Sequence, residues 1–207
     1  MDPHRHAALS ARRHDGDPDD FLALHTRMDA TKELCSDNRH RLLHTIWGIR
    51  TVVLPLVGPT LTTTDRAGQP RTVRTKAVLE FDHVLADFGG RFVPTLGDFV
   101  AAIAPDGDES HRFAEIHARH RGDDEAMRIL LSPYFVTGRI RALLVTHNTW
   151  FLGEVLPQLL GRPLGLVPPG VPPGELFARM RFEPWMDNGA ALPPSAPNTE
   201  EVPCRTS

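Results

Sequence analysis

The chain has 207 residues, 41% of them hydrophobic and 24% charged, which is typical of a globular protein with one domain or one domain and a C-terminal addition. Its formal net charge of −3 gives no reason to expect nucleic acid or an acidic membrane surface as a partner. No apolar run approaches the ~20 residues that span a bilayer, and the first residues lack the apolar core of a signal peptide. Because Cys35 and Cys204 lie far apart, we expect a cytoplasmic protein without a disulfide framework.

Two helices are expected before residue 37. The small residues at 7–11 predict a short first helix, which breaks at 15–17. Pro18 with an aspartate before it is typical of a helix start. Apolar residues at helical spacing then extend the second helix to about Cys35.

A third helix is expected from Asn38 toward Val53, capped by Ser36 or Asp37. Its apolar face is wide, as in a helix that packs against a core. Gly48 lies in its middle and costs roughly 1 kcal/mol relative to alanine. This glycine predicts the close approach of another group.

Residues 60–75 are rich in threonine and predict a small β-hairpin. Another helix is expected from Lys76 to Gly89, where two glycines end it. Thr95 and Asp98 resemble a capping box, which predicts a short helix through Ile103.

The second half of the chain also predicts helices. Residues 111–161 are expected to be helical, with a break at Pro133, and residues 175–182 are expected to form one more short helix. Residues 187–207 are expected to be disordered.

A weak internal repeat links the two halves. Leu43–Trp47 followed by Leu54–Pro55 resembles Thr146–Trp150 followed by Leu156–Pro157, although the spacings differ by one residue. The pattern is compatible with a duplicated helical pair.

The predicted fold class is therefore mainly α, a helical bundle with a small hairpin insertion. We expect a helical, histidine- and aspartate-rich domain over 1–104 and further helices packed on it over 105–161. A proline- and glycine-rich segment with a disordered tail is expected over 162–207.

Histidine and aspartate side chains recur four residues apart in three of these helices. On a helix, residues i and i+4 share one face, so two such side chains can reach one metal ion. The pairs are His25/Asp29, His40/His44 and His83/Asp87. With 11 histidines in the chain, some of these spacings arise by chance, and helical His/Asp pairs also serve as ordinary hydrogen bonds.

Residues 6–103 resemble a family of small, uncharacterised bacterial proteins known only as a domain of unknown function. The combination of matching residues is specific, although each piece alone is weak. It comprises His6, Ser10, Gly16, Leu24, His25, Asp29, Lys32, Asp37, Arg39, His40, Arg41, His44, Gly48, Ile49, Gly58, Pro59, Thr60, His83, Val84, Asp87, Gly89, Pro94 and Thr95. The resemblance implies a shared helical fold and a shared metal site, and it supplies no reaction.

We expect a divalent iron, manganese or zinc ion, because the candidate ligands are imidazoles and carboxylates without thiolates. The candidate metal ligands are His6, His25, Asp29, His40, His44, His83 and Asp87. The candidate catalytic residues are Asp87, Lys32 and Arg39. Together with Arg41, Lys32 and Arg39 either bind an anionic substrate or neutralise nearby aspartates; the second role is more common in proteins.

Two classes of function follow from this centre. One is a metal-dependent enzyme acting on a small molecule, either by activating water, as in hydrolases and lyases, or by binding dioxygen at non-haem iron. The other is a non-catalytic helical module with a structural metal or a polar His/Asp core, which serves protein–protein interaction. A homodimer is possible if the apolar stretch 143–160 packs on a second copy.

Overall fold

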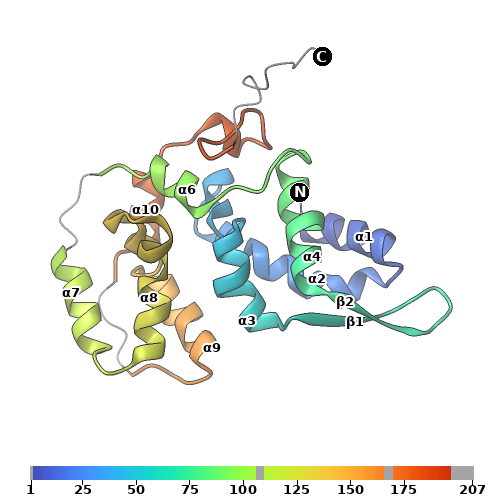
Figure 1. Ribbon diagram of the computed structural model, residues 1–207, viewed down its shortest axis with the longest axis horizontal. Coiled ribbons are helices and arrows are strands. Elements are labelled where there is room, and N and C mark those ends of the chain that lie inside the picture. Colours follow the sequence, from blue (N-terminus) through green and yellow to red (C-terminus); the bar gives the residue numbers. More distant parts are fainter. Residues whose placement is uncertain (1, 106–109, 166–169, 197–207) are drawn as a thin grey trace, which may run out of the picture.

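The structure is a computed structural model that describes residues 2–105, 110–165 and 170–196. Helices form most of it, and the described residues hold one sheet, a two-stranded antiparallel hairpin. This confirms the predicted mainly α class with a small hairpin. Figure 1 shows α1, α2, α4 and the hairpin on one side of the molecule and α7 to α10 on the other.

The first half runs in the order α1 (Pro3–His14), α2 (Pro18–Met28), η1 (Asp29–Glu33), η2 (Asn38–Leu43), η3 (Gly48–Val53), α3 (Leu54–Val57), β1 (Thr60–Thr64), β2 (Pro70–Arg74), α4 (Thr75–Ala77), η4 (Val78–Val84), α5 (Leu85–Asp87) and α6 (Leu96–Ala102). The second half contains α7 (Ser110–Arg119), α8 (Asp124–Thr137), η5 (Ile140–Val145), η6 (Phe151–Val155), α9 (Leu156–Leu160), α10 (Pro173–Arg179) and η7 (Pro184–Met186). The segments η3, η4 and η6 are π-helical and the other η segments are 3₁₀ helices.

Local sequence signals set most of the helix starts in the first half. Asp17 caps α2 by accepting a hydrogen bond from the backbone of Asp19, and Asp37 caps η2 in the same way. Thr95 and Asp98 form the predicted capping box of α6. The hairpin pairs Thr60 with Arg74 and Thr64 with Pro70, within the predicted range 60–75.

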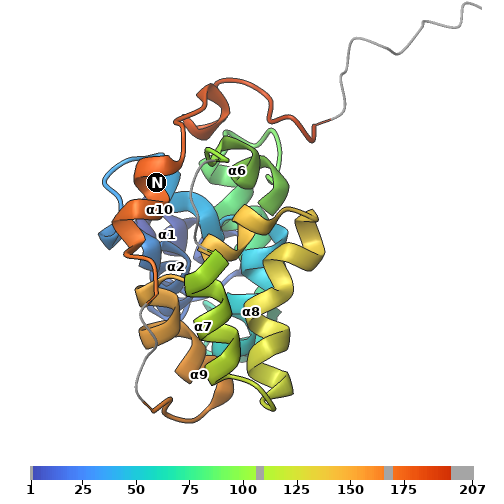
Figure 2. The same cartoon turned by 90° about the vertical axis from the view of Figure 1, so that its left-hand side faces the viewer.

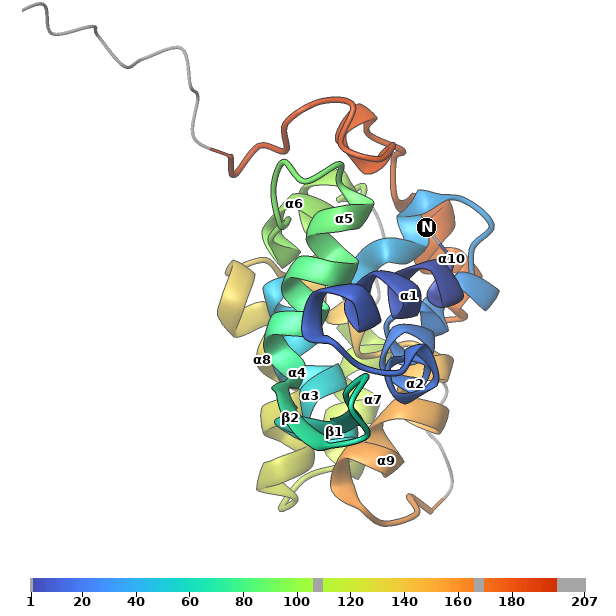
Figure 3. The same ribbon diagram turned by 90° about the vertical axis from the view of Figure 1, so that its right-hand side faces the viewer.

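Both halves contribute to one hydrophobic core. Helix α1 packs on α2 and on η4, and α3 contacts α9 across the two halves. Figure 3 shows α1 lying across the continuous rod formed by α4, η4 and α5. This crossing brings the buried faces of α1, α2 and the rod together, and these faces carry His6, His25 and His83.

The predicted single helix from Asn38 to Val53 is wrong, because the chain turns a corner in its middle. The 3₁₀ helix η2 ends at Leu43, and His44 leaves helical geometry with ψ of 52°. The Thr45 hydroxyl then accepts a hydrogen bond of 3.0 Å from the Gly48 backbone, which starts the next helix. A Cβ on Gly48 would lie 2.1 Å from the Leu43 carbonyl oxygen, so the predicted close approach at this glycine is confirmed.

Gly48→Ala is expected to destabilise the protein by about 2 kcal/mol or more, because the methyl group would force the corner open. Gly153→Ala is the matched control, since Gly153 lies in the π-helical segment η6 and a Cβ there meets nothing within 4 Å. The control is expected to be neutral or up to about 1 kcal/mol stabilising. Urea denaturation of both variants measures the difference, and equal stabilities would refute the tight corner at Gly48.

The internal repeat has a structural counterpart. The 3₁₀ helices η2 and η5 each precede a buried histidine, and Trp47 and Trp150 each precede a π-helical segment. Leu54 and Leu156 then begin α3 and α9, each followed by proline. The one-residue difference in spacing lies in the π-helical segments, which have six residues in η3 and five in η6.

Two expectations for the second half are corrected. Pro133 does not break a helix but lies inside α8. Proline has no N–H to donate to the Ile129 carbonyl, and the Ser132 hydroxyl donates a hydrogen bond of 2.7 Å to this carbonyl instead. Residues 187–196 are placed against the fold, because Ser195 donates hydrogen bonds from its backbone and its hydroxyl to Asp98. The expected disorder of 197–207 lies outside the described residues.

The second half forms a layer of its own in Figure 2, with α7 and α8 in front and α9 below them. Within the described residues, no helix is both long and apolar enough to cross a membrane.

Candidate metal centre

Four buried side chains from three parts of the first half meet in its interior. Asp29 follows α2, His44 follows η2, and His83 and Asp87 lie on the rod of η4 and α5. One ligand atom from each lies within 4.8 Å of the others, and none of the four side chains is more than 6% exposed. We call this group the quartet.

The hydrogen bonds of His44 leave one of its ring nitrogens free to bind a metal. Nε2 lies 3.2 Å from the Met28 carbonyl oxygen, and because a carbonyl only accepts, Nε2 carries the proton. Nδ1 lies 3.2 Å from Oδ2 of Asp87 without a hydrogen bond, and in the neutral ring it is the nitrogen that offers a lone pair to a metal. A ring N–H donated to a backbone carbonyl is the usual way in which proteins orient a metal-binding histidine.

His83 has the same arrangement through a different partner. Its Nδ1 lies 2.9 Å from Nδ1 of His25, whose Nε2 lies 3.0 Å from the Ser10 hydroxyl. Nε2 of His83 is buried without a hydrogen bond, 3.6 Å from Asp29 and 3.8 Å from Asp87. Both hydrogen bonds are satisfied if His83 donates to His25 and His25 donates to Ser10, which leaves a lone pair on His83 Nε2.

The four side chains of the quartet shift one another's pKa values. Burial raises the pKa of Asp29, but its contacts with His44 and His83 outweigh burial and lower it. Burial likewise raises the pKa of Asp87, and its contacts with His44 and His6 lower it overall. Burial opposes a charge on His44, yet the two aspartates raise its pKa, whereas burial holds the pKa of His83 well below its ordinary value.

Arg41 is the buried cation of the site. Its Nε lies 3.5 Å from Oδ2 of Asp87, and its side chain is 5% exposed. It also donates to the backbone carbonyls of Asp87 and Met186 and to the side chain of Asn188. Arg41 is therefore the one guanidinium that faces the two buried carboxylates in the described interior, and Lys32 pairs with Asp29 from a half-exposed position.

His6 joins the quartet from α1. Its Nδ1 lies 2.7 Å from the Asp82 carbonyl oxygen and must donate to it, and its Nε2 lies 3.1 Å from Oδ1 of Asp87. Its ring stacks on His83 with centroids 3.9 Å apart. His6, His25 and His83 form a second group that could hold an ion, so His83 belongs to both groups.

Three further candidates from the sequence lie around the quartet. His40 is buried, with its ring centroid 6.1 Å from that of His44, and lies outside both groups of the described residues. Burial lowers its pKa to about 4. Lys32 is half exposed, with Nζ 3.9 Å from Oδ2 of Asp29. Arg39 pairs with Asp37 and donates to two carbonyls of the C-terminal segment.

The expected neutralisation of aspartates by basic residues is therefore observed. Lys32 pairs with Asp29, Arg39 with Asp37 and Arg41 with Asp87. Arg41 rather than Arg39 reaches the quartet. Ser10, one of the residues that carry the family resemblance, is fully buried and lies 3.0 Å from Nε2 of His25, which it holds in place.

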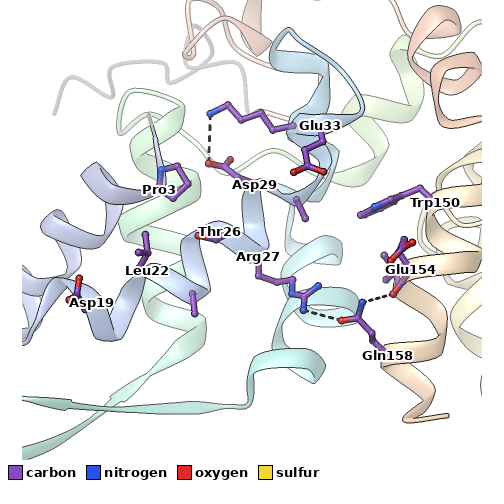
Figure 4. Close-up of a pocket in the computed structure, with 14 residues that line it drawn as sticks. Pro3, Asp19, Leu22, Thr26, Arg27, Asp29, Glu33, Trp150, Glu154 and Gln158 are labelled. Carbon is purple, nitrogen blue, oxygen red and sulfur yellow. Dashed lines mark hydrogen bonds and ion pairs between the residues drawn. The ribbon is translucent and has the colours of Figure 1, made fainter. Parts of the chain in front are cut away.

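A surface groove of about 1160 Å³ reaches the quartet at Asp29. One wall is formed by α2 and η1, and the other by Trp150 with η6 and α9 from the second half of the chain (Figure 4). Asp29 is the one member of the quartet that lines this groove. Sequence reasoning missed Trp150 and Glu154, and the repeat that contains Trp150 was the available signal.

The quartet combines two buried imidazole nitrogens without hydrogen bonds, Nδ1 of His44 and Nε2 of His83, with two carboxylates. Buried polar atoms are almost always hydrogen-bonded, and three atoms of this group, including Oδ2 of Asp29, are not. This donor set could hold a divalent metal ion, as in bundle proteins whose facing helices supply histidines and carboxylates.

The fold and this site define a helical protein with a buried His/Asp cluster beside a surface groove. The family model described as Domain of unknown function (DUF6915) matches residues 1–107, just over half of the chain, and the chain belongs to this family. The expected resemblance to an uncharacterised domain family is confirmed. No curated protein and no solved structure matches the chain significantly.

Proposed function

We propose that the protein is a metal-dependent enzyme whose divalent ion is bound by Asp29, His44, His83 and Asp87. The observation that carries this proposal is the position of Asp29, which belongs to the quartet and also lines the groove. Because Asp29 lines the groove, a small molecule in the groove would approach an ion held by the quartet from the side of Asp29. His6 and Arg41 contact Asp87, and His25 contacts His83, so these three residues would hold the ligands in place.

The donor set supports two reactions. A redox-inert ion such as zinc would lower the pKa of a bound water and activate it for hydrolysis or elimination. Iron bound by two histidines and one carboxylate leaves positions open for dioxygen. In both cases Asp87 is the fully buried ligand, and Asp29 is the ligand or base closest to the substrate. Lys32, with Nζ 3.9 Å from Oδ2 of Asp29, pairs with this carboxylate at the same end of the groove.

A structural metal site is the second candidate. Four protein ligands complete a tetrahedral shell, which is typical of structural zinc. The near-complete burial of all four side chains favours this alternative. A structural ion would exchange slowly and bind no small ligand, whereas a catalytic ion would accept an added ligand such as azide or cyanide from the groove.

Elemental analysis of untagged protein tests the proposal. We expect about one equivalent of iron, manganese or zinc in the wild type, and loss of this metal in His44→Ala and in His83→Ala. His111→Ala is the control, because His111 is 82% exposed on α7. We expect His40→Ala to retain the metal, since His40 lies outside both groups of the described residues. Absence of stoichiometric metal in the wild type after reconstitution would refute the proposal.

A further inference from the structure

The groove has a distinct distribution of charge. Four carboxylates but only two cationic side chains line it, namely Asp19, Asp29, Glu33 and Glu154 against Arg27 and Lys32. Both cations are already engaged, because Arg27 donates a hydrogen bond of 2.9 Å to Gln158 and Lys32 pairs with Asp29. The groove therefore offers negative charge to whatever enters it.

We call the part of the groove lined by Glu33, Trp150 and Glu154 its outer part. Glu33 and Glu154 are exposed, and within the described residues their carboxylates make no ion pair or hydrogen bond. Figure 4 shows Glu33 on one wall and Glu154 on the other. Asp29 differs from both, because its side chain is only 6% exposed and its Oδ2 has no hydrogen-bond partner.

Trp150 adds an aromatic surface between these carboxylates. Its ring is partly exposed and lines the groove, in contrast to Trp47, which holds the equivalent position in the first repeat and is 5% exposed. A cation over the face of a tryptophan gains about 0.5–2 kcal/mol, and nearby carboxylates add to this attraction. An aromatic ring flanked by two unpaired carboxylates is suited to an organic ammonium or guanidinium group.

We infer that the outer part of the groove binds an organic cation, with Trp150 against the cationic group and Glu33 and Glu154 as its counter-charges. The substrate class is therefore an amine or guanidine whose reacting end lies at Asp29. The assignment of the reacting end rests on the proposed metal-dependent function, whereas binding of the cation rests on the outer groove alone.

Matched small probes test this inference. n-Butylguanidinium, n-butanol and butyrate have the same carbon chain and differ in charge, and their binding can be followed by tryptophan fluorescence and by calorimetry at neutral pH. Because Trp47 and Trp185 are buried, Trp150 is the tryptophan that a ligand in the groove will perturb. We expect the cation to bind at least about 10-fold more tightly than the alcohol, which corresponds to roughly 1.4 kcal/mol, and butyrate to bind least.

Substitutions locate the binding site. Glu154→Gln and Glu33→Gln are each expected to weaken the cation about 5-fold while leaving butanol unchanged, and Trp150→Phe should remove the fluorescence response. Glu115→Gln is the control, because Glu115 is an exposed carboxylate of α7 outside the groove. Equal affinity for cation and alcohol, or cation binding that none of the groove variants changes, would overturn the inference.

Repeating the titrations on chelated and metal-loaded protein separates the two proposals. Cation-selective binding by a protein that takes up no metal even after reconstitution would support the groove assignment and count against the metal centre. Stoichiometric metal without cation selectivity would do the opposite.

Discussion

Removal of the metal with a chelator is expected to lower the melting temperature of the loaded protein by about 10 °C. A ligand present at 1,000 times its Kd stabilises the folded state by about 4 kcal/mol, and each kcal/mol corresponds to about 2–4 °C for a domain of this size. The melting temperature falls because, without the ion, the carboxylates of Asp29 and Asp87 lie close together. Arg41 is then the one guanidinium beside them in the described interior. Differential scanning calorimetry before and after chelation measures the effect, and added metal should reverse it.

The variants of the quartet make this measurement specific. His83→Ala is expected to melt at the same temperature with and without chelator, because it lacks the ligand shared by both groups. His111→Ala should retain the full shift of the wild type, since its side chain is exposed. A wild-type protein that is fully loaded with metal yet insensitive to chelation would contradict an ion coupled to folding.

The fold was predictable where local chemistry decides it. Asp17 caps α2, and Thr95 and Asp98 form the capping box of α6. In each case the side chain and the backbone N–H to which it binds lie within three residues, so the sequence alone indicates the cap. The hairpin at 60–75 follows from a run of β-favouring threonines. None of these features requires a contact from elsewhere in the chain.

The candidate centre was predictable only in part. Helical spacing placed His83 and Asp87 on one face, and the structure keeps both in the quartet. The same spacing predicted that His40 and His44 share one helix face. The chain changes direction after Leu43, so His44 lies toward Asp87, and His40 lies next to His44 outside the quartet. That corner depends on the packing of Gly48 against a carbonyl five residues earlier, which periodicity does not reveal.

Which of two neighbouring arginines reaches the quartet was not predictable from the sequence, for a related reason. Arg39 and Arg41 are two residues apart, and their directions depend on whether the segment is an α-helix or a 3₁₀ helix. In the 3₁₀ helix η2, Arg41 points inward to Asp87 and Arg39 points to the C-terminal segment. The groove could not be predicted from local sequence, because its two walls come from segments more than 100 residues apart, at Asp29 and Trp150.

Arg41→Met is expected to destabilise the metal-free protein by about 3–5 kcal/mol, because it leaves Asp87 buried without its cation. The substitution also removes donors from the carbonyl of Met186 and the side chain of Asn188, so the C-terminal segment should loosen. Arg50→Met is the control, since Arg50 is exposed on η3 and should change stability by no more than about 0.5 kcal/mol. Urea denaturation of chelated protein gives both values.

The same substitution is expected to act in the opposite direction on metal affinity. An ion held by Asp87 would lie close to Arg41, whose Nε is 3.5 Å from Oδ2 of Asp87, so the two positive charges would repel each other in the loaded protein. Removal of the arginine therefore costs less stability when the ion is present, and thermodynamic linkage requires the variant to bind the ion more tightly. Competition with a chromogenic chelator measures this affinity. A folded Arg41→Met protein that binds metal more weakly than the wild type would show instead that Arg41 orients Asp87 as a ligand, because orientation and repulsion change the affinity in opposite directions.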